Sequence, residues 1–175
     1  MDIHACYIQF SRLIKENGMK ETCIETKNLC KTYFSSKQGV HVIKNLDMEI
    51  YEGDFTIIMG VSGSGKTTLL YLLSALDEMT SGEVHYGNRS ISKMKPNDLV
   101  SLRRNEIGYI YQGINLVPYL SVLENVAVIG KLKNTKNRDI VANCKKLLCD
   151  LGLEDELYRL PSEISGGQQQ RVAVA

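Results

Sequence analysis

The stretch Gly60-Val61-Ser62-Gly63-Ser64-Gly65-Lys66-Thr67 decides the fold of this chain. It follows the pattern Gly, four residues, Gly-Lys-Thr, in which a glycine-rich loop cradles the phosphates of a nucleotide. The apolar run 55–59 before it predicts a buried strand, and the apolar run 68–73 after it predicts a buried helix. This order of strand, loop and helix favours a nucleotide-binding loop over a plain glycine turn between two core elements.

The composition of the loop follows from the charge of its expected ligand. A triphosphate is held by backbone N–H groups, and turning them inward demands the positive φ angles and close approach that glycine permits. Gly60, Gly63 and Gly65 supply that freedom. A helix that starts at about Lys66 points its positive end at the same anion. Lys66 adds a charge for the β- and γ-phosphates, and Thr67 offers a hydroxyl to Mg²⁺.

The composition is that of an ordinary globular protein. The chain has 175 residues, with 21 basic and 20 acidic side chains and a net charge of +1. This length suggests one domain, and the balanced charge argues against a long-range field that attracts nucleic acid or an anionic membrane. Cys144 lies on an apolar helical stripe, which predicts a core position. The cysteines are odd in number, lack metal-ligand pairing and fit reduced thiols in the cytosol: Cys6, Cys23, Cys30, Cys144 and Cys149.

Residues 1–18 are interpreted as an N-terminal extension with helical periodicity. Charged residues interrupt its apolar positions, which argues against a signal peptide and a membrane span. No other window approaches the length of a transmembrane helix, so work at a membrane requires a partner there. Met19 is an equally good start of the protein. A dispensable helix or a start-codon artefact is favoured over a partner-binding helix.

Alternating apolar and polar residues predict strands around the loop. Residues 23–29 and 40–50 predict an antiparallel ribbon, and residues 83–86 predict a further hairpin-like strand. The apolar run 107–111, which ends on Gln112, predicts a second buried strand. These patterns place an α/β core around the loop.

Helical signals dominate the second half of the chain. A short helix is expected over 97–104, and a helix over 122–129 carries Ile129 on its apolar face. The stripe over 140–151 predicts another helix, and the polar residues 131–138 between these two predict a loop.

A second motif, Ile164-Ser165-Gly166-Gly167-Gln168, stands near the end of the sequence. Ser165 and Gln168 have the spacing of a capping box at a helix start. A plain cap needs no pair of glycines in its first turn, where they cost helix stability. Uncovered N–H groups at the positive end of a helix make a second anion site.

The order of these motifs resembles the ATP-binding domain of ATP-binding-cassette (ABC) transporters over roughly residues 22–175. The finer resemblance is to the ATPases of lipoprotein-release, macrolide-export and peptide-antibiotic-resistance systems. It implies a P-loop NTPase core of ABC type, placed at 19–175, with an antiparallel β ribbon and a helical subdomain at about 113–164. The supporting segments are Gly53-Asp54-Phe55, Arg103-Arg104-Asn105-Glu106-Ile107-Gly108, Gln112-Gly113-Ile114-Asn115-Leu116, Val122-Leu123-Glu124-Asn125-Val126 and Pro161-Ser162-Glu163.

The resemblance implies an ATP site with Mg²⁺ as its metal ion. Tyr33 matches the aromatic that stacks on adenine, with Phe34 as the alternative, although an aromatic at a strand edge often simply packs. Thr67 and Gln112 are implied at the metal, and Gln112 also as the γ-phosphate sensor. The phosphate-binding residues are Gly60, Val61, Ser62, Gly63, Ser64, Gly65, Lys66, Thr67 and Thr68.

The signature motif is implied to complete the ATP site of an opposite protomer. Its residues are Ser165, Gly166, Gly167 and Gln168. A head-to-tail homodimer that sandwiches two ATP molecules follows from this resemblance. The further partner is the transporter's membrane subunit, with the ATPase on the cytoplasmic face of the membrane and no nucleic acid expected.

The sequence stops at Ala175, before the Asp-Glu strand and the histidine that the resemblance leads one to expect. No catalytic base is therefore assigned in the chain, and we expect an incomplete core, marginal stability and little or no hydrolysis by these residues alone. Two other interpretations stay open. One is a soluble ABC switch protein without a membrane subunit, and the other is a degenerate nucleotide-binding fragment.

Overall fold

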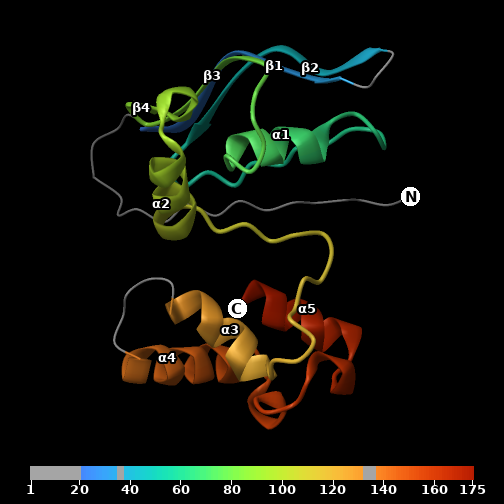
Figure 1. The fold of residues 1–175 in the computed structure, drawn as a ribbon, viewed down its shortest axis with the longest axis vertical. Coiled ribbons are helices and arrows are strands. Elements are labelled where there is room, and N and C mark those ends of the chain that lie inside the picture. The colour runs from blue at the N-terminus through green and yellow to red at the C-terminus, as the bar shows by residue number, and fades with distance from the viewer. Residues whose placement is uncertain (1–20, 35–37, 132–136) are drawn as a thin grey trace. The chain divides into compact units, whose positions relative to one another are not determined.

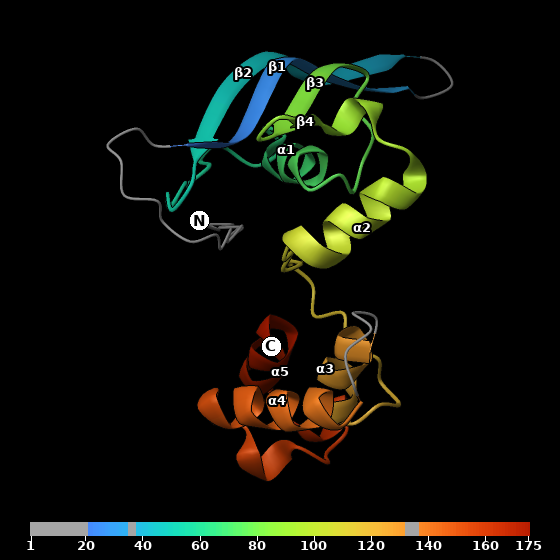
Figure 2. The same cartoon turned by 90° about the vertical axis from the view of Figure 1, so that its left-hand side faces the viewer.

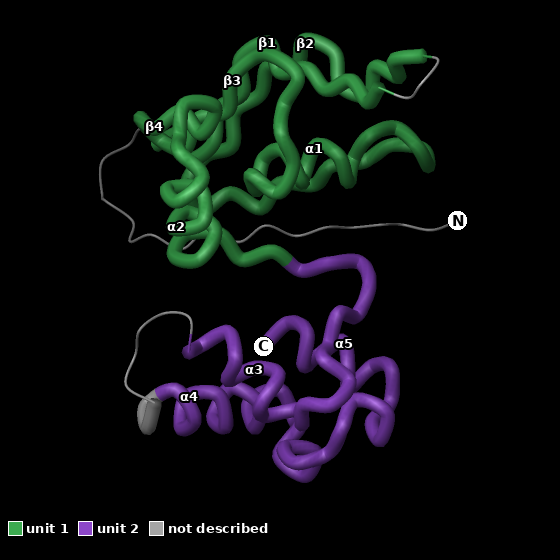
Figure 3. The backbone as a smooth tube through the Cα atoms, in the orientation of Figure 1, with its two compact units in different colours: residues 1–109 green, residues 110–175 purple. Residues whose placement is uncertain are grey.

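A computed structural model describes residues 21–34, 38–131 and 137–175 of the chain. The predicted extension 1–18 lies outside the described residues. The chain divides into two compact units, Met1–Tyr109 and Ile110–Ala175, which Figure 3 distinguishes by colour. Each unit has a hydrophobic core of its own.

The first unit contains a four-stranded antiparallel sheet in the order β2-β1-β3-β4 (Figure 1). The strands are β1 (Thr22–Phe34), β2 (Gly39–Tyr51), β3 (Ser81–Tyr86) and β4 (Arg89–Ser90). The central strand β1 pairs with both neighbours, for example Glu25 with Glu49 on β2 and with His85 on β3. The predicted ribbon and hairpin are therefore confirmed.

Helix α1 (Lys66–Leu73) lies against one face of this sheet (Figure 2). Four leucines along this short helix are buried, and three of them, Leu69, Leu72 and Leu73, share one hydrophobic cluster with residues of the sheet such as Ile24 and Val84. A short 3-10 helix, η1 (Ile91–Lys93), and helix α2 (Pro96–Glu106) follow the sheet. The helix predicted over 97–104 is confirmed, and its Leu102 joins the same core.

The predicted strands 55–59 and 107–111 were wrong, because neither run belongs to the sheet. Phe55, Ile57 and Met59 are exposed, while Ile58 packs partly against the core. Branched and apolar residues favour a strand, but a strand exists only through hydrogen bonds to a neighbour. Among the described residues, the hydrogen-bonded ladders of the sheet involve only the four strands β1, β2, β3 and β4.

The second unit is helical. It contains α3 (Val122–Lys131), α4 (Asn137–Asp150) and α5 (Gly166–Val174), with the 3-10 turns η2 (Glu154–Glu156) and η3 (Pro161–Glu163) between the last two helices. The helices predicted from the apolar stripes are confirmed, except that α4 begins at Asn137, inside the predicted loop.

The core of the second unit gathers apolar side chains from all three helices and the turns. Cys144 is buried there, as predicted, whereas Ile129 faces solvent, contrary to the expected apolar face. The face of α3 that packs instead carries Val122, Val126 and Ala127. No helix in the described part of the chain is long and apolar enough to cross a membrane.

Candidate functional site

The glycine loop combines left-handed backbone with close approaches. Gly63 and Gly65 have φ angles of 79° and 88°, a region that side-chain-bearing residues rarely adopt. A Cβ on Gly65 would lie 2.8 Å from Cγ1 of Val42. Gly60 has no positive φ, but a Cβ there would lie 2.6 Å from Oγ of Ser64. The loop conformation thus requires glycine at Gly63 and Gly65, whereas the Ser64 side chain at Gly60 can rotate away.

Helix α1 begins directly behind this loop without a capping side chain. Gly65 is its N-cap residue, no side chain bonds the first turn, and that turn carries no acidic residue. The first amides of a helix have no acceptor within the helix, and the helix dipole adds positive potential there. The start of α1 is therefore suited to an anionic ligand.

The Lys66 side chain curls over the loop. Its Nζ donates to the carbonyl oxygens of Gly60 at 3.0 Å and Val61 at 2.9 Å, and the residue is only half-buried. Both acceptors are backbone carbonyl oxygens, and among the described residues Lys66 forms no ion pair with a carboxylate, so a phosphate would offer the ammonium a stronger acceptor. Thr67 is exposed beside it. Its hydroxyl fits the role of a single protein ligand to Mg²⁺, which commonly takes its other ligands from phosphates and water.

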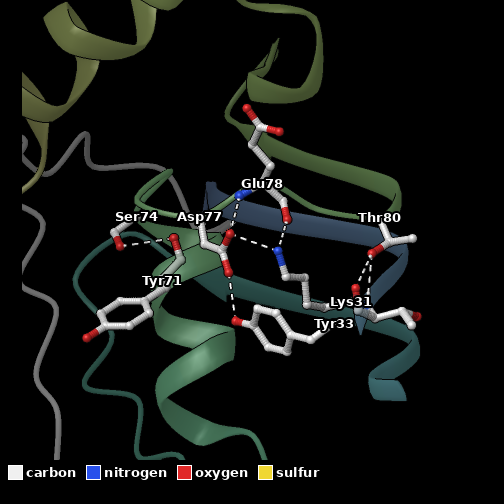
Figure 4. Close-up of polar contacts among 8 residues, drawn as sticks. Lys31, Tyr33, Tyr71, Ser74, Asp77, Glu78 and Thr80 are labelled. Carbon is white, nitrogen blue, oxygen red and sulfur yellow. Dashed lines mark hydrogen bonds and ion pairs between the residues drawn. The ribbon is translucent and has the colours of Figure 1, made fainter. Parts of the chain in front are cut away.

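Tyr33, near the end of β1, lies in a polar cluster with the segment that follows α1 (Figure 4). Its hydroxyl donates to Oδ2 of Asp77 at 2.7 Å, and Nζ of Lys31 lies 4.6 Å from its ring centroid. Burial raises the pKa of the Tyr33 hydroxyl, the Asp77 bond raises it further, and a hydrogen bond from Thr68 works the other way. The ring is 42% exposed, while Phe34 is 79% exposed.

The signature residues form the start of α5. Oγ of Ser165 accepts the N–H of Gln168 at 3.3 Å, and Oε1 of Gln168 accepts the N–H of Ser165 at 2.8 Å, which confirms the capping box. Nε2 of Gln168 also donates to Glu156 at 2.8 Å. Gly166 and Gly167 are exposed, and a Cβ on either would meet no atom within 4 Å.

The structure brings some predicted site residues together and places others in separate units. Tyr33, the glycine loop and Thr68 all belong to the first unit. Gln112 is exposed near the beginning of the second unit, which also holds the signature helix. Within the described residues no group of three or more His, Cys, Asp or Glu side chains forms a metal site.

Sequence reasoning missed Lys31 and Asp77. Lys31 precedes Tyr33 by two positions on β1, and side chains two positions apart on a strand lie on the same face. The sequence could therefore have predicted that Lys31 lies near the Tyr33 ring. Asp77 lies in the segment between α1 and β3, and no local pattern connects it with β1. Its contact with Lys31 spans 46 positions of the chain.

Comparison with known proteins identifies close relatives. The family model described as "ABC transporter" matches residues 43–175. The ATP-binding protein HrtA of Staphylococcus epidermidis is 43% identical over 148 residues, which cover 85% of this chain and 66% of HrtA. The lipoprotein-releasing system ATP-binding protein LolD of Wigglesworthia glossinidia brevipalpis is 40% identical, covering 87% of this chain and 66% of LolD. The macrolide export ATP-binding/permease protein MacB of Pasteurella multocida is 38% identical, and the match covers 90% of this chain and 24% of MacB.

A solved structure shares the fold. The dimeric structure of MJ0796, a bacterial ABC transporter cassette, superimposes with a TM-score of 0.80 at 37% identity, covering 86% of this chain and 67% of that one. A second structure of the same cassette, in a post-hydrolysis state bound to ADP and Pi, gives the same TM-score at 36% identity. The chain thus spans about two thirds of the length of HrtA, LolD and the solved cassette.

Proposed function

Because the chain belongs to the ABC transporter family, with an ATP-binding cassette fold, we propose that it is the ATP-binding part of a transporter. In this role it couples the binding and hydrolysis of ATP to transport or extraction by a membrane partner. The observation that carries the proposal is the uncapped start of α1 behind a loop that requires glycine at Gly63 and Gly65.

The residues of the first unit divide the binding of ATP between them. The loop amides and the start of α1 hold the triphosphate, because N–H donors and the helix dipole favour negative charge there. Lys66 exchanges its carbonyl contacts for the β- and γ-phosphates. Tyr33 offers a ring face to the adenine. Mg²⁺, when bound, would neutralise phosphate charge, and Thr67 of this unit would hold it, with Gln112 of the second unit proposed as a further ligand.

The signature helix serves the ATP site of a second copy of the chain. Gly166 and Gly167 are exposed at the start of α5 and carry no side chains, so their backbone amides can face a phosphate from another molecule. The dimer in the solved cassette structure supports this arrangement. Gln168 holds the turn in shape through its capping bonds.

The membrane partner is supported by the names of the relatives. LolD is an ATP-binding protein of a lipoprotein-releasing system, and MacB is an ATP-binding/permease protein. We place the chain on the cytoplasmic face of the membrane, bound there through a membrane subunit. The Asp, Glu and His that the resemblance assigns to hydrolysis have no counterpart among residues 1–175, so we expect these residues alone to bind ATP without turning it over.

A substitution in the loop tests the proposal. Lys66→Ala removes the charge that faces the phosphates, and we expect ATP affinity to fall about 10- to 100-fold. The matched control is Lys44→Ala, which removes an exposed lysine from β2 in the same unit. Calorimetric titration of the purified protein with ATP and Mg²⁺ measures both. Equal ATP affinity in the wild type and Lys66→Ala, or no binding by the wild type, would overturn the proposal.

A further inference from the structure

Three side chains join the end of β1 to the segment that follows α1 (Figure 4). Oδ1 of Asp77 accepts Nζ of Lys31 at 2.8 Å, and Oδ2 accepts the Tyr33 hydroxyl at 2.7 Å. Both carboxylate oxygens of one residue are therefore committed to the two side chains of β1. Lys31, Tyr33 and Asp77 together form a ring clamp.

Lys31 is the most enclosed member of the ring clamp. The residue is 8% exposed, unusually low for a lysine, and its Nζ also donates to the carbonyl oxygen of Glu78 at 2.6 Å. A charge so enclosed is costly to bury unless it is paired and hydrogen-bonded, and Asp77 and Glu78 supply both. Its ammonium lies 4.6 Å from the Tyr33 centroid, within the range of cation–π attraction.

The ring clamp is tied to the helix that starts at the phosphate loop. The N–H of Asp77 donates to the carbonyl oxygen of Tyr71 on α1 at 3.2 Å. At the other end of the same helix, the Thr68 side chain lies close enough to the Tyr33 hydroxyl to offset part of the rise in the pKa of that group. The Tyr33 hydroxyl is thus linked through Asp77 to the C-terminal part of α1, and it lies near Thr68 in the N-terminal part, which begins at Lys66.

We propose that Lys31 and Asp77 are positioning residues for a purine base: they hold the Tyr33 ring at a fixed place relative to the phosphate loop, with one face turned to the base. The inference rests on the proposed function and extends it to residues outside the nucleotide motifs. Since the Lys31 ammonium lies over one face of the ring, the base stacks on the other. A preset distance between ring and loop lets one ligand engage both without first ordering them.

The test compares a ligand that has a base with one that lacks it. ATP engages both the ring and the loop, whereas inorganic tripolyphosphate engages the loop alone. The variants are Asp77→Asn, which keeps the shape but removes the charge, and Lys31→Met, which keeps an apolar stem. Glu78→Gln is the matched control, because only the backbone of Glu78 contributes to the cluster, through the bonds to Lys31 and Asp77.

We expect Asp77→Asn and Lys31→Met each to weaken ATP binding about 3- to 10-fold, as the loss of a cation–π contact or an ordered stacking partner would do. Their affinity for tripolyphosphate should stay within about twofold of the wild type, since neither residue belongs to the loop. Tyr33→Ala should weaken ATP about 5- to 30-fold and tripolyphosphate very little. Glu78→Gln should change neither affinity.

A double-variant cycle separates positioning from a general structural role. In a Tyr33→Ala background there is no ring to position, so Asp77→Asn should have no further effect on ATP affinity. A further loss there, an equal loss for both ligands, or unchanged ATP affinity in both single variants would overturn the inference. Thermal melts of each variant verify that it is folded.

Failure of the proposed function looks different from failure of the inference. If the wild type binds neither ATP nor tripolyphosphate, or if Lys66→Ala leaves both affinities unchanged, the nucleotide site itself is refuted. If Lys66→Ala weakens both ligands while the ring-clamp variants behave like the wild type, the ATP site stands and only the positioning role is refuted.

Discussion

The two helix starts predicted to face phosphate are built in opposite ways. Helix α1 begins after Gly65, whose backbone is in the left-handed conformation, and this N-cap residue has no side chain to cap the first turn. Helix α5 begins behind Ser165, which exchanges two hydrogen bonds with Gln168 in a complete capping box. At the start of α1 the backbone N–H donors have no capping side chain, whereas at the start of α5 the side chain of Ser165 accepts one of them.

The difference indicates how each start relates to its ligand. An uncapped helix start has amides that only water or a ligand can satisfy, so a phosphate bound there would act as the cap of α1 and stabilise it. A capped start keeps its conformation without a ligand, so the backbone amides of Gly166 and Gly167 are already in place before a ligand binds. We expect α1 to gain order when nucleotide binds, and α5 to need no such help.

The largest effect should come from adding a methyl group at Gly65. Gly65→Ala forces a non-glycine residue into a left-handed conformation and a contact of 2.8 Å with Val42, so we expect a loss of about 2 kcal/mol in the free energy of unfolding of the first unit. Loss of ATP binding should accompany it, because the loop would deform. Hydrogen exchange of α1 amides and ATP titration measure the two effects.

The same change at the other helix start is the matched control. Gly166→Ala meets no atom within 4 Å and has no positive φ, so α5 should be unchanged or more stable by up to about 1 kcal/mol. Equal destabilisation by the two substitutions would contradict the difference between the starts.

A smaller effect should follow from removing the cap of α5. Ser165→Ala deletes the acceptor for the Gln168 N–H, and loss of such a cap typically costs about 1 kcal/mol. Faster hydrogen exchange over α5, with α1 unchanged, is the expected result. Ser162→Ala, an exposed serine on η3, serves as the control. Unaltered protection of α5 in Ser165→Ala would show that the box contributes nothing.

The smallest expected effect is a loss of thermal stability at low pH, through protonation of Asp77. Burial acts to raise the pKa of Asp77, but hydrogen bonds from Lys31, Tyr33 and the Glu78 backbone outweigh it, so its pKa is lowered. A lowered pKa in the folded state means that the stabilisation is present above the unfolded-state pKa of about 3.9 and is lost as the pH falls below it. Between pH 5 and pH 3 the first unit should lose about 1–2 °C of melting temperature through this group.

Asp77→Asn provides the reference for that measurement, because an amide does not titrate in this range. The wild type and the variant should differ in melting temperature at pH 5 and converge toward pH 3. A constant difference between them across this range would show that the carboxylate charge of Asp77 does not contribute to stability.

Much of the fold and part of the site follow from short stretches of sequence. The glycine loop, the start of α1 and the capping box of Ser165 and Gln168 depend on residues within a few positions of each other, so their patterns were sufficient. The paired strands β1 and β2 and the helices of the second unit follow from apolar periodicity for the same reason.

Other features depended on residues that are distant in the sequence. The run 55–59 has the composition of a strand, yet the sheet does not include it, because composition cannot supply a neighbouring ladder. Gly82 is a further example: a Cβ there would lie 2.3 Å from the carbonyl oxygen of Asn28, a contact that pairing of β3 with β1 creates.

The sequence by itself determined that this chain has a phosphate-type loop and a capped glycine helix start, since backbone freedom and capping are local properties. Only the tertiary structure decided that Lys31 and Asp77 meet at the Tyr33 ring and that the apolar runs stay outside the sheet. The physical reason is that charge pairing and strand ladders require two partners, and folding alone determines which distant segments become neighbours.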